Sequence, residues 1–179
     1  MPIVTQASHI GIQKSENCSA MTTGVTENIR KARRALYSLM GTGLHGKNDL
    51  DPETVMFMIR AFILPILTYG LEIVLPKGKN LDNINRQYKK WIKQILPLNI
   101  NVADPAVFIL DGTLPIEAEM HIKAITLYGN ITRANKSSIE WKLAERQLTI
   151  NSHESHSWFT EIKELCLKYR MIFSIYIII

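Results

Sequence analysis

Cysteine is scarce in this chain of 179 residues, which holds only Cys18 and Cys166. The two lie far apart, and neither belongs to a Cys-x-x-Cys pair. This pattern indicates free thiols in a reducing compartment. Since no basic-then-apolar signal segment opens the sequence, we expect an intracellular protein, cytoplasmic or nuclear.

Long uninterrupted apolar segments are also missing. A bilayer-spanning helix needs roughly 20 consecutive apolar residues. The run from Met56 to Leu75 approaches that length, but Arg60, Pro65 and Glu72 interrupt it, and the apolar run at residues 172–179 is far too short. We therefore expect no membrane partner and predict a buried core helix for the first of these runs.

Motifs that carry catalysis or bind metals are not evident. The chain has no adjacent pair of acidic residues and no GxSxG or HExxH pattern. His153 and His156 have the i,i+3 spacing of helical metal ligands, but they lie in a Ser-rich polar stretch without a third ligand nearby, so a solvated loop is favoured. The glycine-rich stretch from Gly41 to Asn48 does not follow a predicted strand, as a P-loop would, and indicates an interhelical loop. We predict no catalytic residue, no metal site and no cofactor.

What the sequence does contain is helical periodicity. Hydrophobic residues make up 46% and charged residues 21%, which is typical of a folded protein. The run from Met56 to Leu75 is preceded by a strong helix start, in which Asp51 caps, Pro52 takes the first position and Glu53 suits the helix dipole. A helix that is apolar on nearly all sides should be buried on nearly all sides, and Pro65 should kink or break it.

Other helices are predicted on both sides of this central run. One extends from Thr26 to Gly41 and another from Leu81 to Leu96; a short helical turn begins at Asp104. Three further helices are expected at residues 116–133, 139–148 and 158–169. A short strand is predicted at residues 8–13, where polar and apolar residues alternate, and residues 3–6 are the nearest candidate partner. The fold class is mainly α, a helical bundle with a short N-terminal strand or hairpin.

Two of these helices carry cations opposite their apolar stripes. The net charge of the chain is +5, and the segment from Lys77 to Lys93 holds six basic residues against one acid, Asp82. One interpretation is a solvated face; the other is a polyanion-binding face, since a merely soluble helix usually mixes in acids. The candidate nucleic-acid-binding residues are Arg30, Lys31, Arg33, Arg34, Arg86, Lys89, Lys90 and Lys93.

Several stretches, taken in order, resemble the downstream part of a reverse transcriptase from a non-LTR (LINE-type) retrotransposon. His9-Ile10-Gly11-Ile12 resembles the signature that closes the palm and forms the primer grip. The basic helix from Ile29 to Leu39 is similar to the first thumb helix, and the segment from Leu64 to Glu72 (LPILTYGLE) is similar to the family pattern RPILTYGSEVW. Tyr88-Lys89-Lys90-Trp91 looks like part of the next thumb element. The resemblance covers most of residues 8–133.

The resemblance implies a domain plan and a partner. Residues 1–25 would be the end of the palm with primer-grip-like His9, Ile10, Gly11 and Ile12, residues 26–100 a thumb-like domain, residues 101–170 a helical extension and residues 171–179 an unassigned hydrophobic tail. A thumb holds an RNA–DNA or DNA duplex by its sugar–phosphate backbone. Pro65 and Tyr69-Gly70 would form the bend of the thumb core, where a charge at Leu64 or Tyr69 should unfold the domain.

The same resemblance implies that this chain is not a polymerase by itself. The family's catalytic aspartates, which hold Mg²⁺, lie upstream of the primer grip, and the chain contains no Asp-Asp pair. We expect a non-catalytic fragment of an RNA-directed DNA polymerase. The alternative is a helical interaction or structural module without any nucleic-acid role, and the sequence leaves the oligomeric state open.

Overall fold

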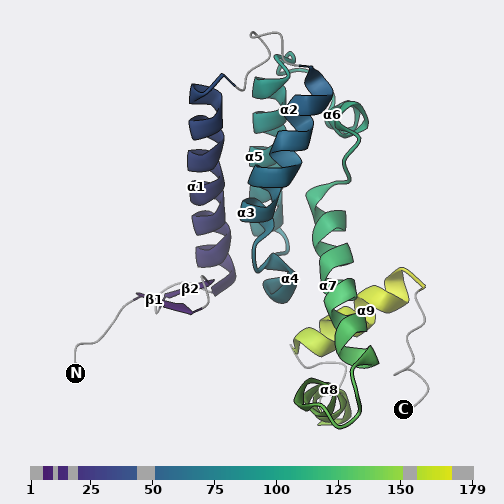
Figure 1. Cartoon of the computed structure of the whole chain (residues 1–179). Coiled ribbons are helices and arrows are strands. Elements are labelled where there is room, and N and C mark those ends of the chain that lie inside the picture. Colours follow the sequence, from purple (N-terminus) through teal and green to yellow (C-terminus); the bar gives the residue numbers. More distant parts are fainter. Residues whose placement is uncertain (1–5, 10–11, 16–19, 44–50, 151–156, 171–179) are drawn as a thin grey trace. The chain divides into compact units, whose positions relative to one another are not determined.

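The structure is a computed structural model that describes residues 6–9, 12–15, 20–43, 51–150 and 157–170. The chain is mainly α-helical, a helical bundle with a short N-terminal β-hairpin, as the sequence predicts (Figure 1). It divides into two compact units, residues 1–119 and residues 120–179, each of which is described by itself. The domain plan based on the resemblance stays a prediction. No helix in the described part is long and apolar enough to cross a membrane.

The hairpin differs from the predicted strand. Strand β1 (Gln6–His9) pairs antiparallel with β2 (Ile12–Ser15), and His9 lies opposite Ile12. The predicted single strand at residues 8–13 is therefore wrong, while most of its candidate partner at residues 3–6 lies outside the described residues. Ile10 and Gly11 join the two strands and lie outside the described residues. Alternation alone cannot distinguish one strand from the two inner ends of a hairpin, because both show the same period of two.

Helix α1 (Ala20–Gly41) begins six residues before the predicted start at Thr26. The added turn contains Thr22, Thr23 and Gly24, which are poor helix formers. Packing outweighs propensity here, because Val25, which lies directly after this turn, is only 1% exposed. The inner face continues with Ile29, Ala32 and Leu36, all of which are buried.

The central apolar run forms several helical segments, which are α2 (Pro52–Met58), the π-helix η1 (Ile59–Ile63), α3 (Leu64–Thr68) and α4 (Leu71–Val74). Of these, η1, α3 and α4 pack against α1. The predicted cap is confirmed, since the Thr54 amide donates to the Asp51 carboxylate at 3.2 Å. The N–H of Leu64 donates to the carbonyl of Ile59, five residues back. This wider turn directly precedes Pro65, whose ring would crowd the preceding turn of a regular α-helix.

The chain leaves the helical path at Tyr69 and Gly70. Gly70 has a φ of 70°, a left-handed conformation that glycine adopts without steric cost. Asn28 of α1 is 6% exposed, and its side-chain amide donates to the carbonyls of Leu67 at 3.2 Å and Tyr69 at 2.8 Å. These bonds satisfy backbone acceptors that the end of α3 leaves open. The break expected near Pro65 thus consists of a π turn before the proline and a stop after it.

The expectation that the central run is buried on nearly all sides is wrong. Val55, Ile59, Ile63, Leu67 and Leu71 form a buried inner face. The outer face is exposed, with Phe57 at 66%, Phe62 at 55%, Tyr69 at 51% and Ile73 at 50%. An apolar composition shows that burial is favourable, but the described residues cover only one face of this run.

This exposure also corrects the expected effect of a charge at Tyr69. A charge there would meet solvent rather than the core, and Leu64 is only half-buried. Leu67, which is fully buried, is the position where a charge would be costly.

Helix α5 (Lys79–Ile95) confirms the predicted apolar stripe. Its side chains Ile84, Tyr88, Trp91, Ile92 and Ile95 are buried. Helix α5 packs against α1 on one side and contacts α6 (Asp104–Asp111) on another. The two basic helices are therefore direct neighbours.

The second unit contains most of α7 (Ile116–Arg133), together with α8 (Ile139–Ile150) and α9 (Trp158–Lys168). These bounds agree closely with the predicted helices. The Tyr128 ring lies 6.5 Å from the rings of both Trp158 and Phe159, between centroids. Cys166 is a buried free thiol, and burial raises its pKa. His153, His156 and Cys18 lie outside the described residues.

We expect Asn28→Ala to lower the free energy of unfolding by about 2–3 kcal/mol, because it removes two hydrogen bonds and leaves a buried carbonyl unsatisfied. Urea titration followed by circular dichroism measures the effect. Asn80→Ala is the matched control, since the Asn80 amide makes one exposed bond to the Thr22 hydroxyl and should cost less than about 1 kcal/mol. Equal losses for the two variants would contradict the role given to Asn28.

Candidate nucleic-acid interface

The predicted cations of α1 differ in how readily an anionic ligand could contact them. Arg30 forms an ion pair with Glu27, one helical turn back, with Nε to Oε2 at 2.8 Å. This hydrogen bond lowers the pKa of Glu27 and raises that of Arg30. Lys31 is half-buried, while Arg33 and Arg34 are exposed. The exposed charge of α1 thus lies mainly at Arg33 and Arg34.

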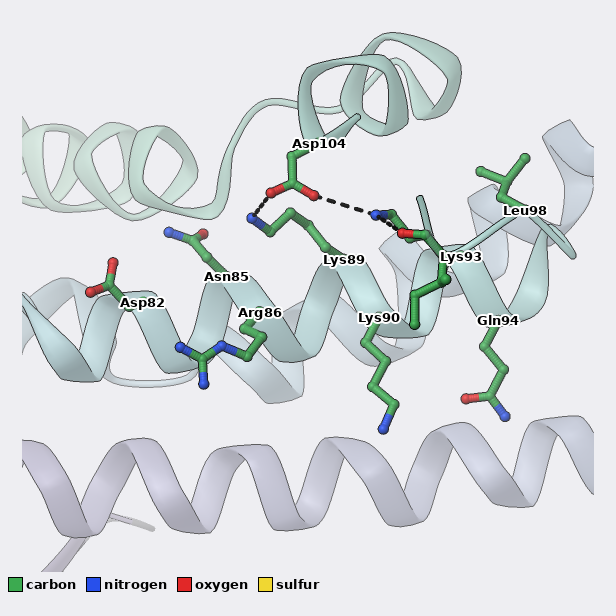
Figure 2. A pocket seen from close by; sticks show the side chains of 10 residues that line it. Asp82, Asn85, Arg86, Lys89, Lys90, Lys93, Gln94, Leu98 and Asp104 are labelled. Atoms are coloured by element: carbon green, nitrogen blue, oxygen red, sulfur yellow. Dashed lines mark hydrogen bonds and ion pairs between the residues drawn. The ribbon is translucent and has the colours of Figure 1, made fainter. Parts of the chain in front are cut away.

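Arg33 connects the basic face of α1 to that of α5. Its guanidinium donates to the side-chain oxygen of Gln87 at 3.1 Å. Gln87 directly follows Arg86 and precedes Lys90 by three residues, so these three side chains lie within one turn of α5. Arg86 and Lys90 are both exposed and project from the side of α5 that faces α1 in Figure 2. The structure therefore brings Arg33, Arg86 and Lys90 together along the α1–α5 contact.

Lys89 and Lys93 project from another side of α5 and have partners within the protein (Figure 2). The Lys89 ammonium donates to one oxygen of Asp104, and the Lys93 ammonium lies 3.5 Å from the other. Lys93 also donates to the carbonyls of Val102 at 2.7 Å and Ile100 at 3.0 Å. Its side chain is only 15% exposed. These two lysines anchor the segment that joins α5 to α6.

Asp104, which contacts both lysines, is held in its charged form. The hydrogen bond from Lys89 is the largest cause that lowers the pKa of Asp104; desolvation opposes it, and the charges of Lys89 and Lys93 lower the pKa further. Asp104 also opens α6, where a negative charge favours the helix dipole.

A groove of about 750 Å³ runs along this part of α5 (Figure 2). Its charged lining consists of four cations and two carboxylates, and the rest is polar or apolar. The residues are Asp82, Asn85, Arg86, Lys89, Lys90, Lys93, Gln94, Leu98, Ile100 and Asp104. The lining thus has a net positive charge of +2, which suits an anionic ligand.

The primer-grip-like residues are only partly described. His9 and Ile12 form the pair at the end of the hairpin, whereas Ile10 and Gly11 lie outside the described residues. Strand β2 contacts α1, so the hairpin lies beside the basic helix. Within the described parts of the chain, His, Cys, Asp and Glu side chains form no cluster of three or more that could hold a metal ion.

The sequence analysis did not predict that acidic residues pair with the candidate cations. Glu27 could have been found, because it precedes Arg30 by three residues on one helix, a spacing at which side chains meet. Asp104 carried no comparable signal, since it lies 15 residues from Lys89 and on a different helix. Only the return of the chain after α5 brings it to the lysines.

The contacts of Lys93 predict a stability role that Lys90 lacks. Lys93→Met removes two hydrogen bonds to carbonyls and a contact with Asp104, and should lower the free energy of unfolding by about 1–2 kcal/mol. Lys90→Met, an exposed position on the same helix, should change it by less than about 0.5 kcal/mol. Thermal unfolding of the two variants measures the difference. If Lys93→Met is as stable as Lys90→Met, the anchoring role is wrong.

Comparisons of the chain with protein-family models, with curated protein sequences and with solved structures give no significant match.

Proposed function

We propose that the chain is a non-catalytic piece of a non-LTR retrotransposon reverse transcriptase that binds the backbone of an RNA–DNA or DNA duplex through α1 and α5. The observation that carries this proposal is the placement of exposed cations on two neighbouring helices, Arg33 and Arg34 on α1 and Arg86 and Lys90 on α5. The order of the three resembling stretches supports it from the sequence.

Backbone recognition requires this kind of surface rather than an enclosed site. Phosphate contacts position a protein on a duplex without reading bases, and they need mobile, exposed cations. Arg86 and Lys90 are four residues apart, so they are separated by about 6 Å along the helix axis. Phosphates repeat every ~3.4 Å of axis along one strand. The two side chains can therefore reach different phosphates of one strand.

The eight candidate cations are not equivalent in this proposal. Arg33, Arg34, Arg86 and Lys90 carry most of the binding, and half-buried Lys31 assists them. Arg30 is paired with Glu27, and Lys89 and Lys93 are bound to Asp104. An ion pair must be exchanged before such a cation can bind a phosphate, so these three contribute less.

A second candidate function, the helical interaction module, is favoured by one observation. The segments α2 to α4 expose four large apolar side chains, Phe57, Phe62, Tyr69 and Ile73. Large exposed apolar side chains that gather in one patch are typical of a surface that contacts another protein. In that case the cations of α1 and α5 are solvated and take no part in function.

Titration of an RNA–DNA hybrid at two salt concentrations separates the two candidates. We expect binding whose affinity falls steeply with salt, because each neutralised phosphate releases counterions. Arg86→Glu with Lys90→Glu should reduce affinity at 0.1 M salt by on the order of 50-fold and lower the salt slope by about 2. The double change should leave the fold intact, since both side chains are exposed.

The matched control is Lys142→Glu with Arg146→Glu. These exposed cations have the same four-residue spacing, but they lie on α8 in the second unit. The control should bind within about threefold of the unchanged protein. Equal losses in both double variants would indicate a general charge effect, and no binding at low salt would favour the interaction module.

The chain should not synthesise DNA. With Mg²⁺, deoxynucleotides and a primed RNA template, we expect no extended primer, because the carboxylates that hold the metal ions in this family have no counterpart in the sequence. A polymerase of the family on the same template serves as the positive control. Templated extension by the purified chain would overturn its description as non-catalytic.

A further inference from the structure

The carboxylate of Asp104 contacts two of the four cations that line the α5 groove. One of its oxygens accepts from Lys89, and the other lies 3.5 Å from Lys93. The Asp104 side chain is 49% exposed, whereas those of Lys89 and Lys93 are 23% and 15% exposed. The carboxylate thus covers the lysines from the solvent side.

The position of Lys93 does not depend on this carboxylate. Its ammonium donates to the carbonyls of Val102 and Ile100, so two hydrogen bonds hold it in place even without Asp104. Neutral carbonyls orient an ammonium but leave its charge uncompensated. Lys93 can therefore bind another anion once the negative charge of Asp104 is removed.

A carboxylate and a phosphate form the same kind of contact with an ammonium. Both accept short, charge-assisted hydrogen bonds through anionic oxygens. A phosphodiester that enters the groove from Arg86 and Lys90 meets the Asp104 carboxylate at Lys89 and Lys93, where like charges repel. Removal of the Asp104 charge would change the net charge of the groove lining from +2 to +3.

We propose that Lys89 and Lys93 form a phosphate-binding position which the Asp104 carboxylate occupies in the free protein, so that Asp104 limits the affinity of the groove for the nucleic-acid backbone. This inference rests on the proposed function and identifies Asp104 as a residue that weakens binding of the nucleic-acid backbone. Asp104 would then have a role in binding as well as the structural role of joining α6 to α5. The volume of the groove, about 750 Å³, is enough for a nucleotide-sized segment.

Asp104→Asn tests the proposal directly in titrations with an RNA–DNA hybrid. Gaining one phosphate contact should raise the salt slope by about 0.9 and tighten binding roughly eightfold at 0.1 M salt. Asp82→Asn is the matched control, because it removes the same charge from the same groove without uncovering Lys89 or Lys93. We expect Asp82→Asn to tighten binding less than about twofold.

Lys89→Met tests the same idea without altering Asp104. In the unchanged protein, Lys89→Met should weaken binding less than about twofold, because its charge is already neutralised, whereas Lys90→Met should weaken it roughly eightfold. Combined with Asp104→Asn, Lys89→Met should cancel most of the gained affinity. This double-mutant cycle also remains informative if Asp104→Asn lowers stability, which circular dichroism would reveal.

The outcomes distinguish this proposal from the proposed function. If the unchanged protein binds the hybrid but Asp104→Asn has the same affinity and salt slope, Asp104 is only a structural tie and the inference is wrong. Equal losses for Lys89→Met and Lys90→Met would also overturn it. If neither the unchanged protein nor Asp104→Asn binds at low salt, the proposed function fails as well. Binding by Asp104→Asn alone would support the role given to Asp104 but would contradict the proposed function of the unchanged protein.

Discussion

The side chain of Asn28 donates hydrogen bonds to the carbonyls of Leu67 and Tyr69, where the central run leaves α3. A helix end exposes acceptors that must be satisfied when they are buried, and α1 supplies the donor from a distance of about 40 residues in sequence. Gly70 can then turn in a left-handed conformation and start α4. The arrangement of α1 against the central run depends on this interaction, and α1 in turn positions Arg33 beside α5.

The same principle, that polar groups acquire fixed partners where the chain folds back, decides which cations are available. The residues of α5 provide a nearly unmixed positive stripe in sequence. In the structure, Lys89 and Lys93 belong to the packing of α6 and its connecting segment, while Arg86 and Lys90 project toward α1. The count of basic residues is therefore larger than the number of charges open to a ligand. The distribution of acids, Glu27 and Asp104, accounts for the difference.

Much of the fold followed from local patterns. The apolar stripe of α5, the cap at Asp51 and the bounds of α7, α8 and α9 were predicted closely, because spacing and capping act within a few residues. The start of α1 and the hairpin register were predicted poorly, since the packing of Val25 and the pairing of His9 with Ile12 arise between elements. The exposure of Phe57 and Phe62 was missed for a related reason, because burial needs a covering neighbour as well as an apolar side chain.

The sequence by itself determined that the chain is helical, that its central run is interrupted near Pro65, and that α1 and α5 carry the basic residues. Each of these properties depends on the spacing of neighbouring residues along one helix. Only the tertiary structure decided that Asn28 closes the end of α3, that Arg33 meets Gln87, and that Asp104 covers Lys89 and Lys93. These contacts join positions separated by 39, 54 and 15 residues, and no local periodicity specifies which distant side chain completes a hydrogen bond.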